Sequence, residues 1–198
     1  RAAKAGDPEA MVQVARFHIR MKQVPQAMTW FRRAAGLGST EAMDELAGIH
    51  HDRGEIEVAE PLYRQAANLG NTESMIALGA IYSKERKDDR QARAWFQKAI
   101  DAGDAQGFAY LGAHCNLNGR TAESVQAFQK AADAGVAWAM VALGNYYRSQ
   151  RDFGEAREWY TKAEAAGDPE AEDLLREVAQ SRETSSGCFI ATAVYGSY

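Results

Sequence analysis

The sequence predicts an all-α protein, an α-solenoid of about five helix-turn-helix repeats of 32–33 residues in a right-handed superhelix, followed by a short non-repeat tail. The hexapeptide AGDPEA occurs at residues 5–10 and again at residues 166–171. Between the two copies, glycines recur at steps of 32, 32, 33, 32 and 32 residues, at Gly6, Gly38, Gly70, Gly103, Gly135 and Gly167. Most of these glycines precede a short polar pair and then Glu or Gln, which indicates the end of one helix and the start of the next.

The first helix of each repeat is expected to begin just after the repeat glycine. Apolar residues follow the glycine at positions 5 and 8, and a small residue usually follows at position 9, as in Met43, Leu46 and Ala47. This spacing places them on one face of a helix. The fifth repeat departs from the pattern, because Val136 stands where the other repeats have a polar capping residue.

The second helix of each repeat is expected to carry an aromatic pair, as in Trp95-Phe96, with Ala99 four residues after the first member. The small residue of the first helix would let the second helix approach closely, while the aromatic residues fill the core. The turns between the two helices are predicted near Gln23-Val24-Pro25, Arg53-Gly54, Arg86-Lys87-Asp88, Asn118-Gly119 and Arg151-Asp152. Residues 170–180 are predicted to form a capping helix, because Glu172 and Arg176 replace its apolar and small residues.

The fifth repeat carries a family resemblance. The run Ala-Leu-Gly-Asn-Tyr-Tyr at 142–147, with Ala156, Trp159-Tyr160-Thr161-Lys162-Ala163 and Ala166-Gly167-Asp168, resembles Sel1-like repeats, which are related to the tetratricopeptide repeat. The similarity extends over residues 1 to about 180. It implies an α-solenoid scaffold that binds proteins or peptides.

Composition excludes several classes of function. The net charge is −4 and opposite charges are interleaved, so no basic stripe is available for nucleic acid. No apolar run approaches the roughly 20 residues of a membrane span. Two cysteines, Cys115 and Cys188, exclude a disulfide framework and a cysteine-rich zinc module.

No catalytic residues, metal ligands or cofactors are predicted. His18, His50 and Cys115 occupy the position held by Tyr82 and Tyr147 in other repeats, and they are interpreted as half-buried core residues. Histidines one repeat apart would be separated by about 10 Å, too far to share one metal ion. The glycines follow the repeat spacing rather than that of a phosphate-binding loop.

A partner is expected to bind the first helices, at positions 3, 6, 7, 10, 13 and 14 after each glycine. The candidate partner-binding residues are Trp138, Tyr110, Asn145, Arg148, Asn116, Ile76 and Arg16. Trp138 replaces the Glu or Gln of other repeats, which favours either a binding role or filling of the space beside Ala127 and Ala137. Asn145 matches a peptide-binding asparagine of some tetratricopeptide grooves, but Val141 stands where the lysine of that motif is expected.

The domain organisation is predicted as a solenoid over residues 1–180, a flexible hinge over 181–187 and an apolar tail over 188–198. The tail begins Cys-Phe-Ile-Ala-Thr-Ala and resembles the CFI box found near the C-termini of assorted bacterial proteins. We expect it to dock on a solenoid of the same or another copy, which would allow self-association. The tail residues expected to dock are Cys188, Phe189, Ile190, Val194 and Tyr195.

The leading functional hypothesis is a protein- or peptide-binding scaffold or adaptor, without enzymatic activity. An inhibitor or immunity protein that blocks a toxic enzyme is the first alternative, and a thiol-dependent enzyme or modified tail using Cys188 is the second. The chain begins at Arg1 in what resembles a second helix, so we expect that it was cut from a longer precursor. A cytoplasmic location is favoured, and a periplasmic location stays open.

Overall fold

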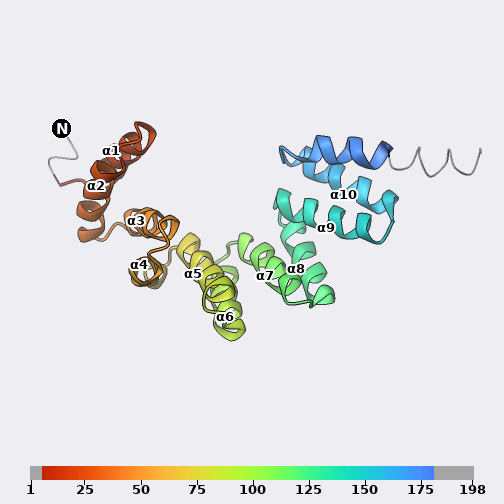
Figure 1. Cartoon of the computed structure of the whole chain (residues 1–198), viewed down its shortest axis with the longest axis horizontal. Helices are drawn as coiled ribbons and strands as arrows, with labels where there is room; N and C mark the ends of the chain where they lie inside the picture. The colour runs from red at the N-terminus through yellow and green to blue at the C-terminus, as the bar shows by residue number, and fades with distance from the viewer. Residues whose placement is uncertain (1–5, 181–198) are drawn as a thin grey trace, which may run out of the picture. The chain divides into compact units, whose positions relative to one another are not determined.

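The computed structural model describes residues 6–180, and within this range the chain is helical and contains no strand (Figure 1). The first helices of the repeats are α1 (Pro8–Arg20), α3 (Thr40–Asp52), α5 (Thr72–Lys84), α7 (Gln106–Leu117) and α9 (Ala137–Ser149). The second helices are α2 (Val24–Gly36), α4 (Ile56–Asn68), α6 (Asp89–Asp101), α8 (Thr121–Asp133) and α10 (Phe153–Ala165). A further helix occupies residues 171–180. The predicted order of helix pairs is therefore confirmed.

The chain divides into two compact units, Arg1–Gly107 and Phe108–Tyr198. In the first unit, α1 packs on α2, α3 on α4 and α5 on α6, while α2 contacts α3 and α4 contacts α5. In the second unit, α9 packs on both α8 and α10. The predicted hinge and docking tail, including Cys188, Phe189, Ile190, Val194 and Tyr195, lie outside the described residues and stay predictions.

The ends of the helices follow the capping pattern of the sequence. Asp7 accepts a hydrogen bond from the backbone N–H of Glu9 at 3.0 Å, and Asn71 accepts one from Ser74 at 2.7 Å. Gly38, which follows α2, has φ of 89°, a left-handed conformation in which side chains are unfavourable. Helix α9 begins after Val136 without a side-chain cap, as its sequence predicted.

Within each pair, the second helix approaches a small residue of the first. A Cβ atom on Gly79 would lie 2.4 Å from Cε1 of Phe96, and one on Gly144 would lie 2.4 Å from Cε1 of Tyr160. In the fourth repeat, a Cβ atom on Gly112 would lie 2.9 Å from Cδ1 of Phe128. These aromatic rings therefore rest directly on helix backbone, which confirms the close approach that the sequence predicted.

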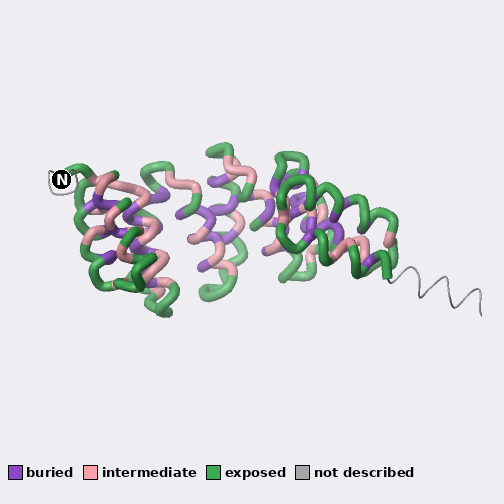
Figure 2. Tube along the Cα trace, turned by 90° about the horizontal axis from the view of Figure 1, so that it is seen from above, coloured by how far each residue is buried: buried purple, intermediate pink, exposed green. Residues whose placement is uncertain are grey.

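The core of each unit is a set of apolar side chains between the helices, and buried and exposed residues alternate along each helix (Figure 2). One cluster in the first unit contains Val12, Phe31 and Ala42. Along residues 171–180, Val178 is buried in a cluster with Tyr160. Glu172 and Arg176 on the same helix are exposed, so the predicted capping helix is confirmed. In the described part of the chain, no helix is long and apolar enough to cross a membrane.

We predict that Gly79→Ala destabilises the protein by about 1–3 kcal/mol, because the added methyl group would displace the Phe96 ring. Gly48→Ala is the matched control, since the only nearby atom, Oη of Tyr63, would lie 3.6 Å from the new Cβ. Alanine there is expected to stabilise helix α3 by up to about 1 kcal/mol. Urea unfolding of both variants measures the difference, and equal effects would contradict the close packing of α5 on α6.

We also predict that Leu143→Ala destabilises the protein by about 2–5 kcal/mol, because Leu143 is fully buried and its truncation leaves a cavity. Leu111 occupies the same repeat position but is only half-buried. Leu111→Ala is therefore expected to cost less. Thermal and urea unfolding test the ranking, which fails if Leu111→Ala is the more destabilising change.

Candidate protein-interaction surface

The candidate surface is the face of the first helices, and one of its predicted rows is buried. Position 6 after the repeat glycine was expected to be exposed, but Ile76 is only 9% exposed and Val12 is 0% exposed. The reason is contact between neighbouring repeats: Val12 shares a core cluster with Ala42 of the next first helix, and Val141 shares one with Ala171. The prediction that Ile76 is exposed is therefore wrong.

The second repeat has a charged residue in this otherwise apolar row. Asp44 is half-buried, and its Oδ1 accepts a hydrogen bond from Oγ of Ser74 on α5 at 2.6 Å. Burial raises the pKa of Asp44, the charges of Glu73, Glu45 and Glu41 raise it further, and the hydrogen bond from Ser74 partly offsets these effects. The net shift is upward, so the ionised form of Asp44 is disfavoured by folding.

Arg16, a predicted partner-binding residue on α1, is engaged within the chain. Its Nη2 lies 2.6 Å and its Nε 2.9 Å from Oε1 of Glu45, and its Nη1 lies 2.8 Å from Oε1 of Glu41. These contacts tie α1 to α3. All three side chains are partly exposed, so this arrangement adds little stability but fixes the position of the arginine.

The histidines at position 12 after the repeat glycine, His18 and His50, contact side chains just before the second helices of their repeats. His50 is buried, and its Nδ1 lies 2.5 Å from Oε2 of Glu55, the residue before α4. In the first repeat, Nδ1 of His18 lies 2.7 Å from Oε1 of Gln23. Between residues 6 and 180, no group of three or more His, Cys, Asp or Glu side chains is placed to hold a metal ion.

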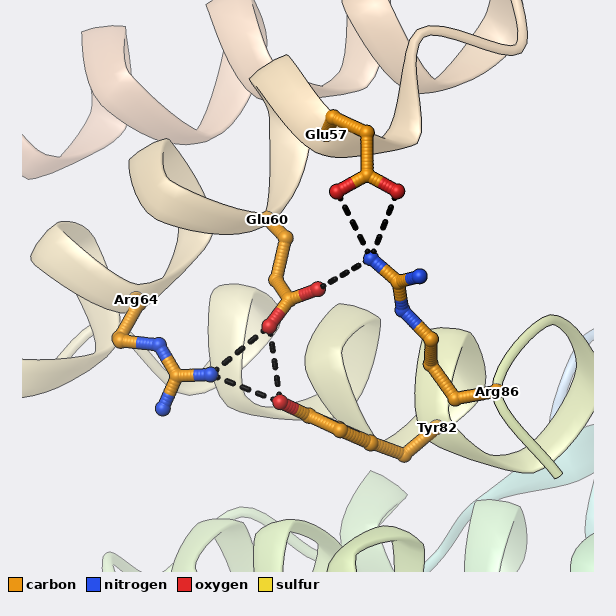
Figure 3. A network of polar contacts seen from close by, with 5 residues as sticks. All are labelled: Glu57, Glu60, Arg64, Tyr82 and Arg86. Atoms are coloured by element: carbon orange, nitrogen blue, oxygen red, sulfur yellow. Dashed lines mark hydrogen bonds and ion pairs between the residues drawn. The ribbon is translucent and has the colours of Figure 1, made fainter. Parts of the chain in front are cut away.

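A polar network joins α4 to α5 and to Arg86, which lies two residues after the end of α5 (Figure 3). Tyr82 donates a hydrogen bond to Oε1 of Glu60 at 2.8 Å, while Arg64 donates to both Tyr82 and Glu60. Nη2 of Arg86 lies 3.0 Å from both carboxylate oxygens of Glu57 and 3.1 Å from Oε2 of Glu60. Burial raises the pKa of Glu60, but hydrogen bonds from Tyr82, Arg64 and Arg86 reverse this effect and give a net lowering.

Sequence reasoning did not identify this network as a unit. The spacing of Glu57, Glu60 and Arg64 places them on one helix face, which is the only local signal. Their partners Tyr82 and Arg86 are 18 to 29 residues away along the chain. They could be paired only by knowing how one repeat stacks on the next.

In the second unit, the structure brings Tyr110 and Trp138 together. Their ring centroids are 5.3 Å apart at an interplanar angle of 70°, and the Trp138 ring also packs edge-on against Phe128 at 5.9 Å. Tyr110 is 39% exposed, whereas Trp138 is half-buried. The contact with Phe128 supports the packing interpretation of Trp138, while Tyr110 presents the more accessible ring.

The remaining predicted residues of this unit differ in their surroundings. Asn145 is exposed, and its Oδ1 accepts a hydrogen bond from the hydroxyl of Tyr160 at 2.8 Å. Nη1 of Arg148 lies 2.7 Å from Oε2 of Glu177 on the capping helix. Asn116 is exposed near the end of α7. The structure therefore does not gather all the predicted residues into one site, and their binding roles stay predictions.

The raised pKa of Asp44 predicts a pH-dependent effect of Asp44→Asn. A carboxyl group whose pKa is raised on folding destabilises the folded protein when it ionises. This destabilisation grows as the pH rises from the unfolded pKa of 3.8 through the folded pKa. Asparagine removes this loss and can still accept the hydrogen bond from Ser74. We expect the variant to be more stable than the parent at pH 7, with a smaller difference below pH 3.8.

Urea unfolding at both pH values measures this effect. Asp52→Asn is the control on the same helix, because Asp52 is exposed, and we expect it to change stability by less than about 0.5 kcal/mol. A loss of stability at pH 7 for Asp44→Asn would contradict this prediction, because it would show that the charged carboxylate stabilises the contact between α3 and α5.

Comparison with known families supports the repeat assignment. Residues 21–39, 40–71 and 72–104 match the Sel1 repeat, and residues 136–163 match the tetratricopeptide repeat. The ends of the Sel1 segments fall within one residue of the repeat glycines Gly38, Gly70 and Gly103. The chain has no match among curated proteins.

Solved structures with the same fold include a Sel1 repeat protein from Oxalobacter formigenes, with 23% identity and a TM-score of 0.68 over 84% of this chain and 76% of that one. The protective antigen c5321 of uropathogenic Escherichia coli has 23% identity and a TM-score of 0.68 over 88% of this chain and 41% of its own. Pseudomonas aeruginosa pilF has 18% identity and a TM-score of 0.69 over 100% of this chain and 96% of its own.

At these identities the likeness shows the fold alone. It agrees with the helix pairs described above and with the family matches along the sequence. The chain is therefore an α-helical repeat protein in which residues 21–104 match Sel1 repeats and residues 136–163 match a tetratricopeptide repeat.

Proposed function

We propose that this protein is a scaffold that binds a protein or peptide ligand on the exposed face of its first helices, with Tyr110 as a central contact. The observation that carries the proposal is the exposed aromatic ring of Tyr110, held in place by Trp138. Tyrosine and tryptophan are over-represented among the residues that dominate binding energies at protein interfaces. A ring that is already fixed loses little conformational freedom on binding.

A second exposed apolar residue extends this contact along α7. Leu117 is 70% exposed, and it lies seven residues after Tyr110, which places both on the same side of the helix. Exposed Asn116 adds hydrogen-bonding capacity next to Leu117. An apolar contact with a polar neighbour is typical of a surface that binds another protein.

The family supports a binding role without naming the ligand. Repeat proteins of this architecture present extended surfaces that are well suited to binding other proteins. Among proteins with the same fold, PilW is described as a widely conserved type IV pilus biogenesis factor. Its identity to this chain is 15%, so we derive no partner from it, and our proposal rests on the surface around Tyr110.

We predict that Tyr110→Ala reduces capture of the ligand from a lysate of the source organism by about tenfold or more, because truncation removes a binding contact. Glu158→Ala, at an exposed position on the second helix α10, is the matched control and should capture the ligand as the parent does. Quantitative mass spectrometry of the captured proteins measures the change.

The melting temperature of each variant separates binding from folding. Tyr110→Ala is expected to melt close to the parent, because Tyr110 is largely at the surface. Trp138→Phe keeps an aromatic ring against Phe128 and tests the supporting role of Trp138. Equal recovery of the same proteins by the parent and Tyr110→Ala would exclude this surface as the binding site.

A further inference from the structure

Helix α3 of the second repeat has no side chain at Gly48, where the hydroxyl of Tyr63 approaches it, and we call this position the notch. Tyr63 of α4 is only 6% exposed, and its hydroxyl points at Gly48 of α3, where a Cβ atom would lie 3.6 Å from Oη. This hydroxyl forms no hydrogen bond with any residue of the described part of the chain. A phenol that is otherwise buried therefore presents a polar atom to the surface of α3 without a partner.

The fifth repeat shows how the same position is filled elsewhere. Asn145 is the counterpart of Gly48, ten residues after the repeat glycine, and Tyr160 is the counterpart of Tyr63. There, the Tyr160 hydroxyl donates a hydrogen bond to Oδ1 of Asn145 at 2.8 Å. The second repeat has the tyrosine but no side chain that could bond to its hydroxyl at this position, so the Tyr63 oxygen is available to accept a hydrogen bond from a ligand.

Carboxylates surround the notch. Asp44 and Asp52 lie four residues before and four residues after Gly48, one helical turn away on each side and on the same face of α3. Glu45 lies three residues before Gly48. The charges of all three carboxylates add to burial in raising the pKa of Tyr63, which places their negative potential at its hydroxyl.

The protein supplies little positive charge to this cluster. Arg16 binds Glu45 through Oε1, but Asp44 accepts its hydrogen bond from the neutral hydroxyl of Ser74. Asp52 is exposed and forms no hydrogen bond or ion pair with any described residue. The two carboxylates that flank Gly48 therefore have no cationic partner within residues 6–180.

We propose that the notch formed by Tyr63, Gly48, Asp44 and Asp52 binds a lysine or arginine side chain of the protein's ligand. The proposal rests on the scaffold function above and specifies part of its ligand. A cationic N–H group could donate to the Tyr63 oxygen and to a flanking carboxylate, and such charge-assisted bonds are short and strong. The described residues hold no cluster fit for a metal ion, which favours an organic cation.

The probe is a peptide, acetyl-Gly-Ser-Arg-Gly-Ser-amide, titrated into the full isotope-labelled chain at low salt. Its counterpart with neutral citrulline in place of arginine has nearly the same shape. We expect arginine, and a lysine version, to shift the Gly48 amide and the Tyr63 ring resonances in a saturable way, while citrulline leaves them unchanged. Loss of the charge-assisted bonds corresponds to about tenfold or more in affinity.

Gly48→Asn is the decisive variant, because it places at the second repeat the side chain that caps tyrosine in the fifth. Its Cβ fits at an ordinary contact distance, and the variant is expected to fold and to bind arginine at least about tenfold more weakly. Tyr63→Phe removes the hydroxyl and provides a second test if Gly48→Asn is unstable. Asn145→Gly opens the equivalent position beside Val141 and Ser149, which lack charge, and should gain no arginine binding.

Three results would overturn the proposal: equal shifts with citrulline, unchanged arginine binding by both Gly48→Asn and Tyr63→Phe, or the same saturable shifts with calcium chloride alone. These results are independent of the scaffold function, which is read from ligand capture by Tyr110→Ala. If Tyr110→Ala loses the ligand while Gly48→Asn and Tyr63→Phe both retain arginine binding, the scaffold function stands and the notch proposal does not.

Discussion

The contact of an aromatic ring with the backbone of the neighbouring helix is the constraint on which the third, fourth and fifth repeats depend. At Gly79, Gly112 and Gly144 there is no room for a Cβ atom, so the distance between the two helices is set by the thickness of the ring. Such a contact also fixes where the far end of the ring emerges. When the ring is tyrosine, its hydroxyl reaches the surface of the first helix, as Tyr160 does at Asn145. Packing of a tyrosine ring in the core thus places its hydroxyl oxygen at the face that we propose as the binding surface.

Contacts between neighbouring repeats are less uniform than contacts within a repeat, because some are apolar and others are polar. Val12 lies in an apolar cluster with Ala42, whereas Asp44 and Ser74 form a hydrogen bond between the equivalent positions of the next two repeats. The Glu60 network then adds a polar connection between α4 and α5 on the second-helix side (Figure 3). In a repeat protein, stability is approximately a sum of repeat and neighbour terms, so these differences make some seams weaker than others. A charged residue that binding requires can therefore lie at one contact between repeats without changing the contacts between the other repeats.

The sequence was sufficient to predict the helices, their caps and their close pairing, because these features depend on residues within one repeat. The missing cap at Val136 was visible for the same reason. Which residues of the first helices are exposed was predicted less well. The helical period identifies the side that packs on the second helix of the same repeat, but it does not identify the residues that the next repeat covers. That is why Ile76 was expected at the surface and is buried. The internal contacts of Arg16 likewise depend on Glu41 and Glu45 in another repeat.

Asp44 connects stability with the proposed specificity. Valine, isoleucine or alanine fills the same position in other repeats, at Val12, Ile76, Ala109 and Val141. A carboxylate at this place loses hydration, as its raised pKa shows, and its hydrogen bond from Ser74 recovers only part of that loss. An arriving cation would provide the missing counter-charge, so the energy lost in folding would be recovered in binding. A charge that is unfavourable in the free protein therefore favours a basic ligand over a neutral one of the same shape, which is how a site distinguishes similar partners.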